Sequence, residues 1–126
     1  MQNRCARICT SNFDYNVPSR SLLKQLKWMD IETRYNYYVG ILMYKYVNGF
    51  ITENLCNQFT LVNQSHLHNT RASSSNDICL PLPHTELLKR NLTYSGPALW
   101  NSLPLCLRNS CNIISFKRSL KTFLLD

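Results

Sequence analysis

Glycine and long apolar runs are both scarce in this sequence. Only three of its 126 residues are glycine, namely Gly40, Gly49 and Gly96, so the sequence contains none of the glycine-rich loops that hold phosphate groups in nucleotide-binding proteins. No apolar run approaches the roughly 18 residues that a membrane-spanning helix needs, and the first residues lack the apolar centre of a secretory signal. We therefore expect a chain that does not enter a membrane and that resides inside the cell, in the cytoplasm or the nucleus.

Acidic residues are also few, and they do not cluster. Polymerases and nucleases hold divalent metal ions between neighbouring carboxylates, which neutralise charge during phosphoryl transfer. The acidic residues here are Asp14, Asp30, Glu32, Glu53, Asp77, Glu86 and Asp126. They are scattered, none is adjacent to another, and several occupy positions typical of helix caps. The sequence therefore predicts no two-metal site and no catalytic residue.

The cysteines and histidines show no regular metal-ligand spacing. Structural zinc sites combine two closely spaced pairs of Cys or His ligands. The near pairs are Cys5 with Cys9, His66 with His68, and Cys106 with Cys111. We expect reduced cysteines, because no secretory signal accompanies them, and we expect neither a metal nor a cofactor. A free-standing enzyme that uses Cys or His is an alternative for which the sequence offers no acid, base and nucleophile pattern.

Positive charge, in contrast, is in excess. Lys and Arg number 14 against seven Asp and Glu, which gives a formal net charge of +7. Such an excess on a small protein favours polyanionic partners, nucleic acid first, although it can also serve only to keep the surface soluble. The chain is 44% hydrophobic, enough to build a core, and its length fits a single domain over residues 1–126.

Apolar residues at helical spacing predict a mainly α-helical domain of four to six helices. The strongest helix should begin after Asp30, an N-cap, and end near Asn48 and Gly49. Its apolar stripe consists of Ile31, Tyr35, Tyr38, Val39, Leu42 and Tyr46. A last helix should begin after a cap at Asn112 or Ser110, be apolar on one side and basic on the other, and pack against the central helix. Shorter helices are predicted at residues 4–12, 20–29 and 52–59.

Two further stretches are not predicted as regular helices. Residues 60–77 are polar and rich in Ser and Asn, which predicts a flexible loop. Within residues 77–95, ICLPLP and KRNLTY can pair as a short β-hairpin at a sheet edge, where Pro81 and Pro83 are tolerated. The Glu-Leu-Leu-Lys run between them is equally compatible with a helical turn.

Two strings near the end of the chain resemble a known family when taken together. YSGPALWNSLP and the following LRNSCNIISFKRSLKTFLL resemble the C-terminal region of reverse transcriptases encoded by non-LTR, LINE-like retrotransposons. The matching residues are Tyr94, Gly96, Trp100, Asn101, Leu103, Pro104, Phe116, Lys117, Leu120 and Lys121. Upstream, RCARI also resembles the family, and further matches are Leu26, Trp28, Arg34, Lys45, His68 and Arg71. The resemblance covers nearly the whole chain, with a departure at residues 84–90.

The resemblance implies a non-catalytic tail of a longer RNA-directed DNA polymerase, because the family's polymerase and endonuclease domains lie upstream. The chain would then be a fragment and not itself an enzyme. Its partners would be the upstream polymerase domain and, weakly and without sequence specificity, template RNA or target DNA. The candidate nucleic-acid contacts are Lys24, Lys27, Arg34, His68, Arg71, Lys117, Arg118 and Lys121. The candidate structural residues are Trp28, Gly96, Trp100, Asn101, Leu103, Pro104, Phe116 and Leu120.

Two alternatives to nucleic-acid binding stay open. The basic groups can simply be the solvated faces of helices, which are usually charged. The module can also be structural, packing on the missing polymerase domain through exposed aromatic surface, or it can be an interaction domain that a host has adopted.

Trp100 lies between residues that interrupt regular structure. Gly96 and Pro97 precede it, and Pro104 follows it. We expect the first two to turn the chain, residues 98–102 to form one helical turn, and Pro104 to end that turn. Trp100 would then be held in the core between the central and last helices.

Overall fold

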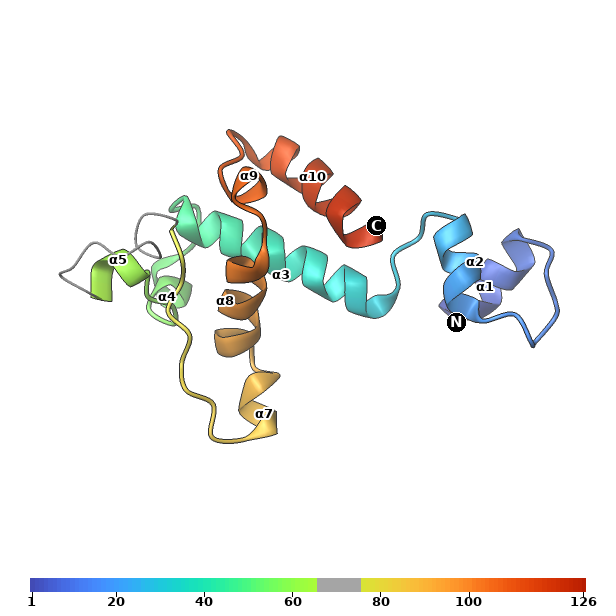
Figure 1. Ribbon diagram of the computed structural model, residues 1–126, viewed down its shortest axis with the longest axis horizontal. Coiled ribbons are helices and arrows are strands. Elements are labelled where there is room, and N and C mark those ends of the chain that lie inside the picture. Colours follow the sequence, from blue (N-terminus) through green and yellow to red (C-terminus); the bar gives the residue numbers. More distant parts are fainter. Residues whose placement is uncertain (66–75) are drawn as a thin grey trace.

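The computed structural model describes residues 1–65 and 76–126 (Figure 1). In this described part the chain forms nine α-helices and no β-strand, and an isolated bridge pairs Leu61 with Ile78. The helices are α1 (Gln2–Cys9), α2 (Ser19–Gln25), α3 (Ile31–Val47), α4 (Glu53–Cys56), α5 (Val62–Ser65), α7 (Glu86–Lys89), α8 (Leu92–Ser102), α9 (Leu105–Arg108) and α10 (Ile113–Leu125). The mainly α-helical fold is confirmed. The helices outnumber the four to six predicted because four of them are single turns.

Helix α3 is the axis of the structure, and α8 and α10 pack against it (Figure 1). It begins as predicted, because Asp30 Oδ1 accepts a hydrogen bond from the Thr33 amide at 2.8 Å and so satisfies a free N–H of the first turn. It also ends as predicted. Gly49 follows the helix with φ +73°, a left-handed conformation that glycine adopts without steric cost.

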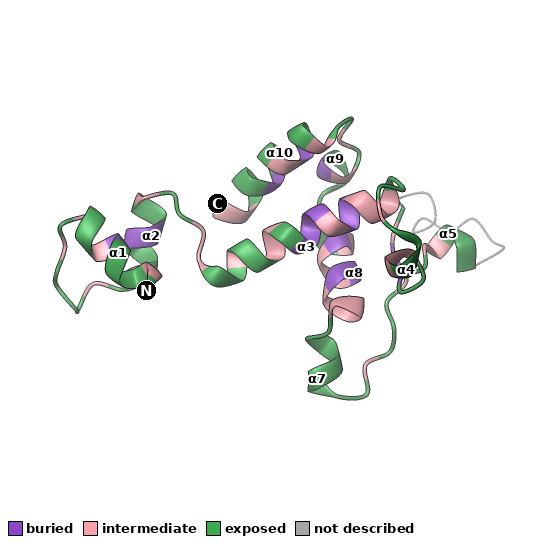
Figure 2. Cartoon of the chain, turned by 180° about the vertical axis from the view of Figure 1, so that it is seen from behind, coloured by how far each residue is buried: buried purple, intermediate pink, exposed green. Residues whose placement is uncertain are grey.

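The main core lies where α3 crosses α8 and α10 (Figure 2). Trp100 and Phe116 are completely buried, their ring centroids 6.1 Å apart, and Tyr44 stacks on Phe116 at 4.4 Å. The buried members of this core are Val39, Ile41, Met43, Tyr44, Phe59, Ile78, Trp100, Leu103, Phe116 and Leu120. The prediction that the central and last helices meet around Trp100 is therefore confirmed.

Gly96 and Pro97 do not turn the chain, contrary to the prediction. Both lie inside α8, which Asn91 caps by accepting a hydrogen bond from the Thr93 amide on its Oδ1 at 3.4 Å. The helix therefore starts well before the expected single turn. Gly96 serves instead as a contact between helices. A Cβ atom at this position would lie 3.0 Å from Met43 Sδ, so the missing side chain lets α8 approach α3 closely.

The β-hairpin predicted within residues 77–95 is also wrong. Thr85 caps α7 by accepting a hydrogen bond from the Leu88 amide at 3.3 Å, and Asn91 caps α8. The cap residues Thr85 and Asn91 therefore favour helix over strand in the segments that follow them. The alternative of a helical turn at Glu86–Lys89 is confirmed. Of the loop predicted at 60–77, residues 62–65 form α5, and residues 66–75 lie outside the described part.

A short segment, residues 76–78, is attached to α8 by side chains that bind its backbone and to α9 by an ion pair. Trp100 Nε1 donates to the Asn76 carbonyl at 3.1 Å. Asn101 accepts from the Ile78 amide at 3.0 Å and donates to the Ile78 carbonyl at 2.8 Å. The Trp-Asn pair thus acts as a two-sided clamp, and an ion pair between Arg108 and Asp77 reinforces it. Downstream of the pair Leu103 is buried, and Pro104 precedes the first turn of α9.

Helices α1 and α2 form a separate, smaller cluster beside the start of α3 (Figure 1). Its buried residues are Ala6, Leu22 and Leu23. The loop between the two helices is closed by Arg7, whose guanidinium donates to the carbonyls of Asp14 at 2.5 Å and Val17 at 2.9 Å. The single domain over residues 1–126 stays a prediction.

Replacing Trp100 by Ala should lower the free energy of unfolding by about 3–5 kcal/mol, because it removes the largest buried side chain and leaves a cavity. Urea unfolding followed by circular dichroism measures this. The matched control is Phe50→Ala, because Phe50 is an exposed aromatic residue. This substitution should change the free energy of unfolding by no more than about 0.5 kcal/mol. Equal unfolding midpoints for Trp100→Ala and the wild type would contradict the role assigned to the indole.

Replacing Asn101 by Leu should cost about 1–3 kcal/mol, since the buried Ile78 then loses both partners of its backbone N–H and C=O groups. The same urea titration applies. Asn109→Leu, on the exposed turn after α9, is the control and should have little effect. A stability loss no larger than that of the control would show that the clamp is dispensable.

Candidate nucleic-acid interface

Lys27 and Trp28 are positioned by the way α2 ends. The Lys27 amide donates to the Lys24 carbonyl at 3.0 Å, and the Trp28 amide donates to the Leu23 carbonyl at 2.9 Å. This pair of hydrogen bonds is the Schellman motif, which requires a left-handed residue after the helix. Lys27 occupies that position with φ +54°. A non-glycine residue in this conformation costs about 1–2 kcal/mol of stability. At this residue α2 has ended and the chain turns toward α3.

A groove opens where α1, the α2–α3 connection, α3 and α10 meet, and its volume is about 860 Å³. We call it the basic groove. It is lined by Gln2, Cys5, Lys27, Trp28, Met29, Ile31, Arg34, Tyr37, Tyr38 and Lys121. Among these described lining residues three are cationic and none is acidic. Because its cations come from the connection, α3 and α10, the groove exists only in the folded chain.

Aromatic residues line the basic groove together with the cations. Trp28 is 38% exposed and Tyr38 is 64% exposed. Arg34 and Tyr38 are one helical turn apart on α3 and therefore lie on the same face. Tyr37 is half-buried against the main core and meets Tyr38 edge to face, with ring centroids 5.5 Å apart. The groove thus combines positive charge with accessible flat rings.

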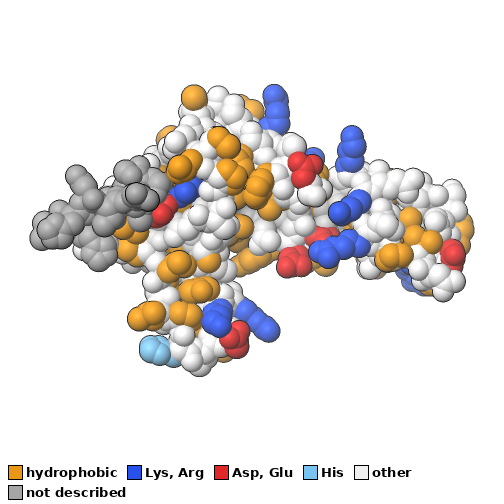
Figure 3. Space-filling view, in the orientation of Figure 1, with side chains coloured by type: hydrophobic (Ala, Val, Ile, Leu, Met, Phe, Trp, Pro, Cys, Tyr) orange, Lys and Arg blue, Asp and Glu red, His pale blue; other side chains and the backbone are white. Residues whose placement is uncertain are grey.

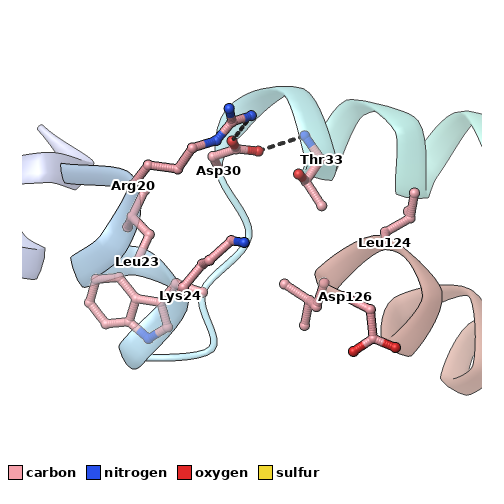
Figure 4. A pocket seen from close by; sticks show the side chains of 9 residues that line it. Arg20, Leu23, Lys24, Asp30, Thr33, Leu124 and Asp126 are labelled. Carbon is pink, nitrogen blue, oxygen red and sulfur yellow. Dashed lines mark hydrogen bonds and ion pairs between the residues drawn. The ribbon is translucent and has the colours of Figure 1, made fainter. Parts of the chain in front are cut away.

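A second pocket of about 260 Å³ lies between α2, the start of α3 and the end of α10 (Figure 4). It is lined by Arg20, Leu23, Lys24, Trp28, Asp30, Thr33, Leu124, Leu125 and Asp126. We call it the charge-balanced pocket, because its lining has two cations and two carboxylates. Arg20 lies 3.5 Å from Asp30. The two carboxylates of this pocket oppose the binding of a polyanion to it.

The Asp30 carboxyl in this pocket has a lowered pKa. Hydrogen bonds from the Thr33 side chain and backbone are the main cause, and the Arg20 guanidinium contributes through its positive charge and a hydrogen bond. Figure 4 shows Arg20 and Thr33 on two sides of the carboxylate. Asp30 is therefore committed to capping α3 and holding α2 beside it.

The structure brings together only some of the predicted nucleic-acid contacts. Lys27, Arg34 and Lys121 line the basic groove, whereas Lys24 lines the charge-balanced pocket. Lys and Arg side chains gather where the α1–α2 pair meets α3, with carboxylates among them (Figure 3). Two further predicted contacts, Lys117 and Arg118, are on α10 but line neither pocket. The last two, His68 and Arg71, lie outside the described residues.

The predicted structural residues divide in a similar way. The buried ones are Gly96, Trp100, Leu103, Phe116 and Leu120, and Asn101 forms the backbone clamp. Trp28 differs from these, because its ring is partly exposed and lines both pockets.

Part of the predicted apolar stripe of α3 faces solvent. Val39 is buried and Leu42 packs against the main core, but Ile31, Tyr35 and Tyr38 are exposed. The reason is that α8 and α10 cross only part of the helix, while the α1–α2 pair stands beside its start without covering it. Groove residues such as Tyr38 and Ile31 were therefore assigned to the core by periodicity. The nearby polar and partly polar residues Lys27, Trp28 and Arg34 were the feature of the sequence that could have indicated an exposed surface here.

Groups of potential metal ligands and membrane-length helices are both absent from the described residues. In that part of the chain no three His, Cys, Asp or Glu side chains are close enough together to hold a metal ion, and the six cysteines are free. Within the same residues no helix is long and apolar enough to cross a membrane. No protein-family model, curated protein or solved structure shows a significant match to the chain.

Asp30 should make stability fall in acid. Its pKa is lowered from 3.8 by folding, so its contribution is complete above about pH 4 and is lost as the pH falls through the folded-state pKa. Asp30→Asn keeps a capping oxygen without a titrating group. Between pH 6 and pH 3 the urea midpoint of the wild type should therefore drop more than that of Asp30→Asn. Parallel pH dependences for the two proteins would contradict the capping role of the carboxylate.

Proposed function

We propose that the chain is a non-catalytic nucleic-acid-binding module that holds phosphate groups in the basic groove. The observation that carries this proposal is the convergence of Lys27, Arg34 and Lys121 from three separate elements on one groove whose described lining has no carboxylate. Cationic side chains that converge in this way concentrate a positive potential, which attracts polyanions.

The binding should be weak, without sequence preference and sensitive to salt. Each phosphate neutralised by Lys or Arg releases counterions, so the logarithm of the affinity falls with the logarithm of the salt concentration by about 0.7–0.9 for each contact. Three contacts predict a slope of about −2 to −3. The net charge of +7 adds a diffuse attraction to this local term.

The resemblance to the C-terminal region of non-LTR retrotransposon reverse transcriptases agrees with this proposal. In a protein of that type the module would follow the polymerase domain and support the binding of template RNA or target DNA. Trp28, Arg34 and Lys121, three of the positions that carry the resemblance, also line the groove. Origin from such an element remains part of the proposal.

A second candidate function is protein interaction, and the segment around α7 favours it. This segment projects from the main core (Figure 1), with hydrophobic side chains visible at its surface (Figure 3). Leu82 is 86% exposed and Leu87 is 77% exposed, and Leu80 and Leu88 are exposed beside them. An exposed apolar group of this kind is typical of a contact with another domain. Co-expression with an upstream polymerase domain that relieves aggregation of the isolated chain would favour this function.

Lys27→Gly tests the proposed nucleic-acid site with little risk to folding. Glycine is the preferred residue at a left-handed helix end, so the variant should be at least as stable as the wild type. Its affinity for a 12-nucleotide RNA should fall, and the slope of log affinity against log salt should become shallower by about 0.7. Fluorescence anisotropy between about 50 and 200 mM salt measures both.

Arg118→Gln is the matched control, because it removes one exposed charge from α10 outside the groove. It should affect RNA binding less than Lys27→Gly does. Equal effects of the two variants would indicate diffuse attraction instead of a groove. No binding of RNA or DNA by the wild type at about 50 mM salt would overturn the proposed function altogether.

A further inference from the structure

We propose that the basic groove accepts an unpaired strand of nucleic acid, whose bases stack on Trp28 and Tyr38. This inference rests on the proposed function, because it assumes that the groove binds nucleic acid, and it adds which form is bound. A phosphate site made only of cations would accept paired and unpaired strands alike. The accessible rings are the feature that separates the two forms.

Both rings come from residues with a restrained backbone, and both residues are exposed to solvent in part. The backbone of Trp28 is fixed by its hydrogen bond to the Leu23 carbonyl, 2.9 Å long. Tyr38 is supported by the half-buried Tyr37, which contacts it edge to face at 5.5 Å. Aromatic side chains on a restrained backbone lose less conformational freedom than those on a flexible segment when a base stacks on them.

The groove combines cations with rings, as a strand combines phosphates with bases. Lys27 is adjacent to Trp28, and Arg34 is one helical turn from Tyr38. Each ring therefore belongs to a residue that has a cationic residue close to it along the chain. In a duplex the bases are paired and stacked inside, so a duplex offers phosphates to the cations but no ring faces to the aromatic residues. Stacking on aromatic side chains is the common means of binding single strands without sequence preference.

The size of the groove fits a short stretch of strand. Its volume of about 860 Å³ is in the range of sites for small molecules, about 300–1000 Å³. Lys121 adds a third cation from α10. We therefore expect the groove to hold a few nucleotides and the flanking nucleotides to remain in solvent.

The decisive comparison uses three ligands with the full chain: a 12-nucleotide oligothymidylate, a strand of the same length made only of abasic deoxyribose phosphates, and a 12-base-pair duplex. The first two have equal charge and differ only in their bases. Oligothymidylate should bind at least about fivefold more tightly than the abasic strand, as expected for a single stacked base. The duplex should resemble the abasic strand once affinities are expressed per phosphate.

Tryptophan fluorescence gives an independent readout, because the two tryptophans differ in accessibility. Trp28 is partly exposed, whereas Trp100 is completely buried and serves as an internal reference. Stacking of a base should quench the emission of Trp28. Oligothymidylate should therefore quench part of the total emission at saturation, and the saturated abasic strand should not.

Variants separate stacking from folding. Trp28→Ala should bring the affinities for oligothymidylate and the abasic strand within about twofold of each other. Tyr38→Ala should reduce the difference between these two affinities. Trp28→Phe and Tyr38→Phe keep a ring and should keep most of the difference. Phe50→Ala, which removes an exposed ring beyond the other end of α3, is the control and should leave it unchanged.

The outcomes distinguish this inference from the proposed function. If oligothymidylate and the abasic strand bind equally, with a salt slope near −2 and no quenching, the stacking inference is overturned and phosphate binding stands. If none of the three ligands binds, both fail. A preference for oligothymidylate that survives Trp28→Ala and Tyr38→Ala would also overturn the inference, because the bases would then be recognised elsewhere.

Discussion

The structure depends on the burial of one indole between three helices. Trp100 comes from α8, packs near Phe116 of α10, and is fully enclosed beside α3. Its single polar group donates to the Asn76 carbonyl, so the ring is buried without an unsatisfied hydrogen-bond donor. With Asn101 bound to Ile78, the same dipeptide joins the apolar core to a segment that has no regular structure of its own. The relative placement of α3 and α10, and hence of Arg34 and Lys121, follows from this arrangement.

The sequence predicted the elements whose signals are local. Asp30 is a cap as predicted, Asn112 is the cap of the last helix out of the two predicted alternatives, Asn112 and Ser110, and the period of apolar residues located the long helices correctly. Prediction failed where neighbours in space decide the outcome. Gly96 was assigned to a turn because glycine often breaks helices, yet its role is to admit Met43 of another helix. Tyr38 fits the apolar period of α3 but is exposed, since periodicity does not reveal how much of a helix its partners cover.

The sequence predicted which basic residues belong to the candidate site, but not which of them lie together in space. Lys27, Arg34 and Lys121 were recognised as basic candidates, while Lys24, equally basic, lies in a pocket with its own carboxylates. What selects among them is the path of the chain after α2. That path depends on a left-handed residue, which is usually revealed in a sequence by glycine. Here the residue is Lys27, so the signal was absent, and a cation occupies a position where glycine would be easier to accommodate.

The division of the core into two clusters has a consequence for how the groove behaves over time. The α1–α2 pair buries only Ala6, Leu22 and Leu23 among the described residues, far fewer than the main core. A unit with so little buried surface opens at a lower free energy than the rest of a protein, and its amide hydrogens exchange sooner. One wall of the groove therefore belongs to the smaller of the two clusters, and a bound molecule that touched both walls would slow that exchange.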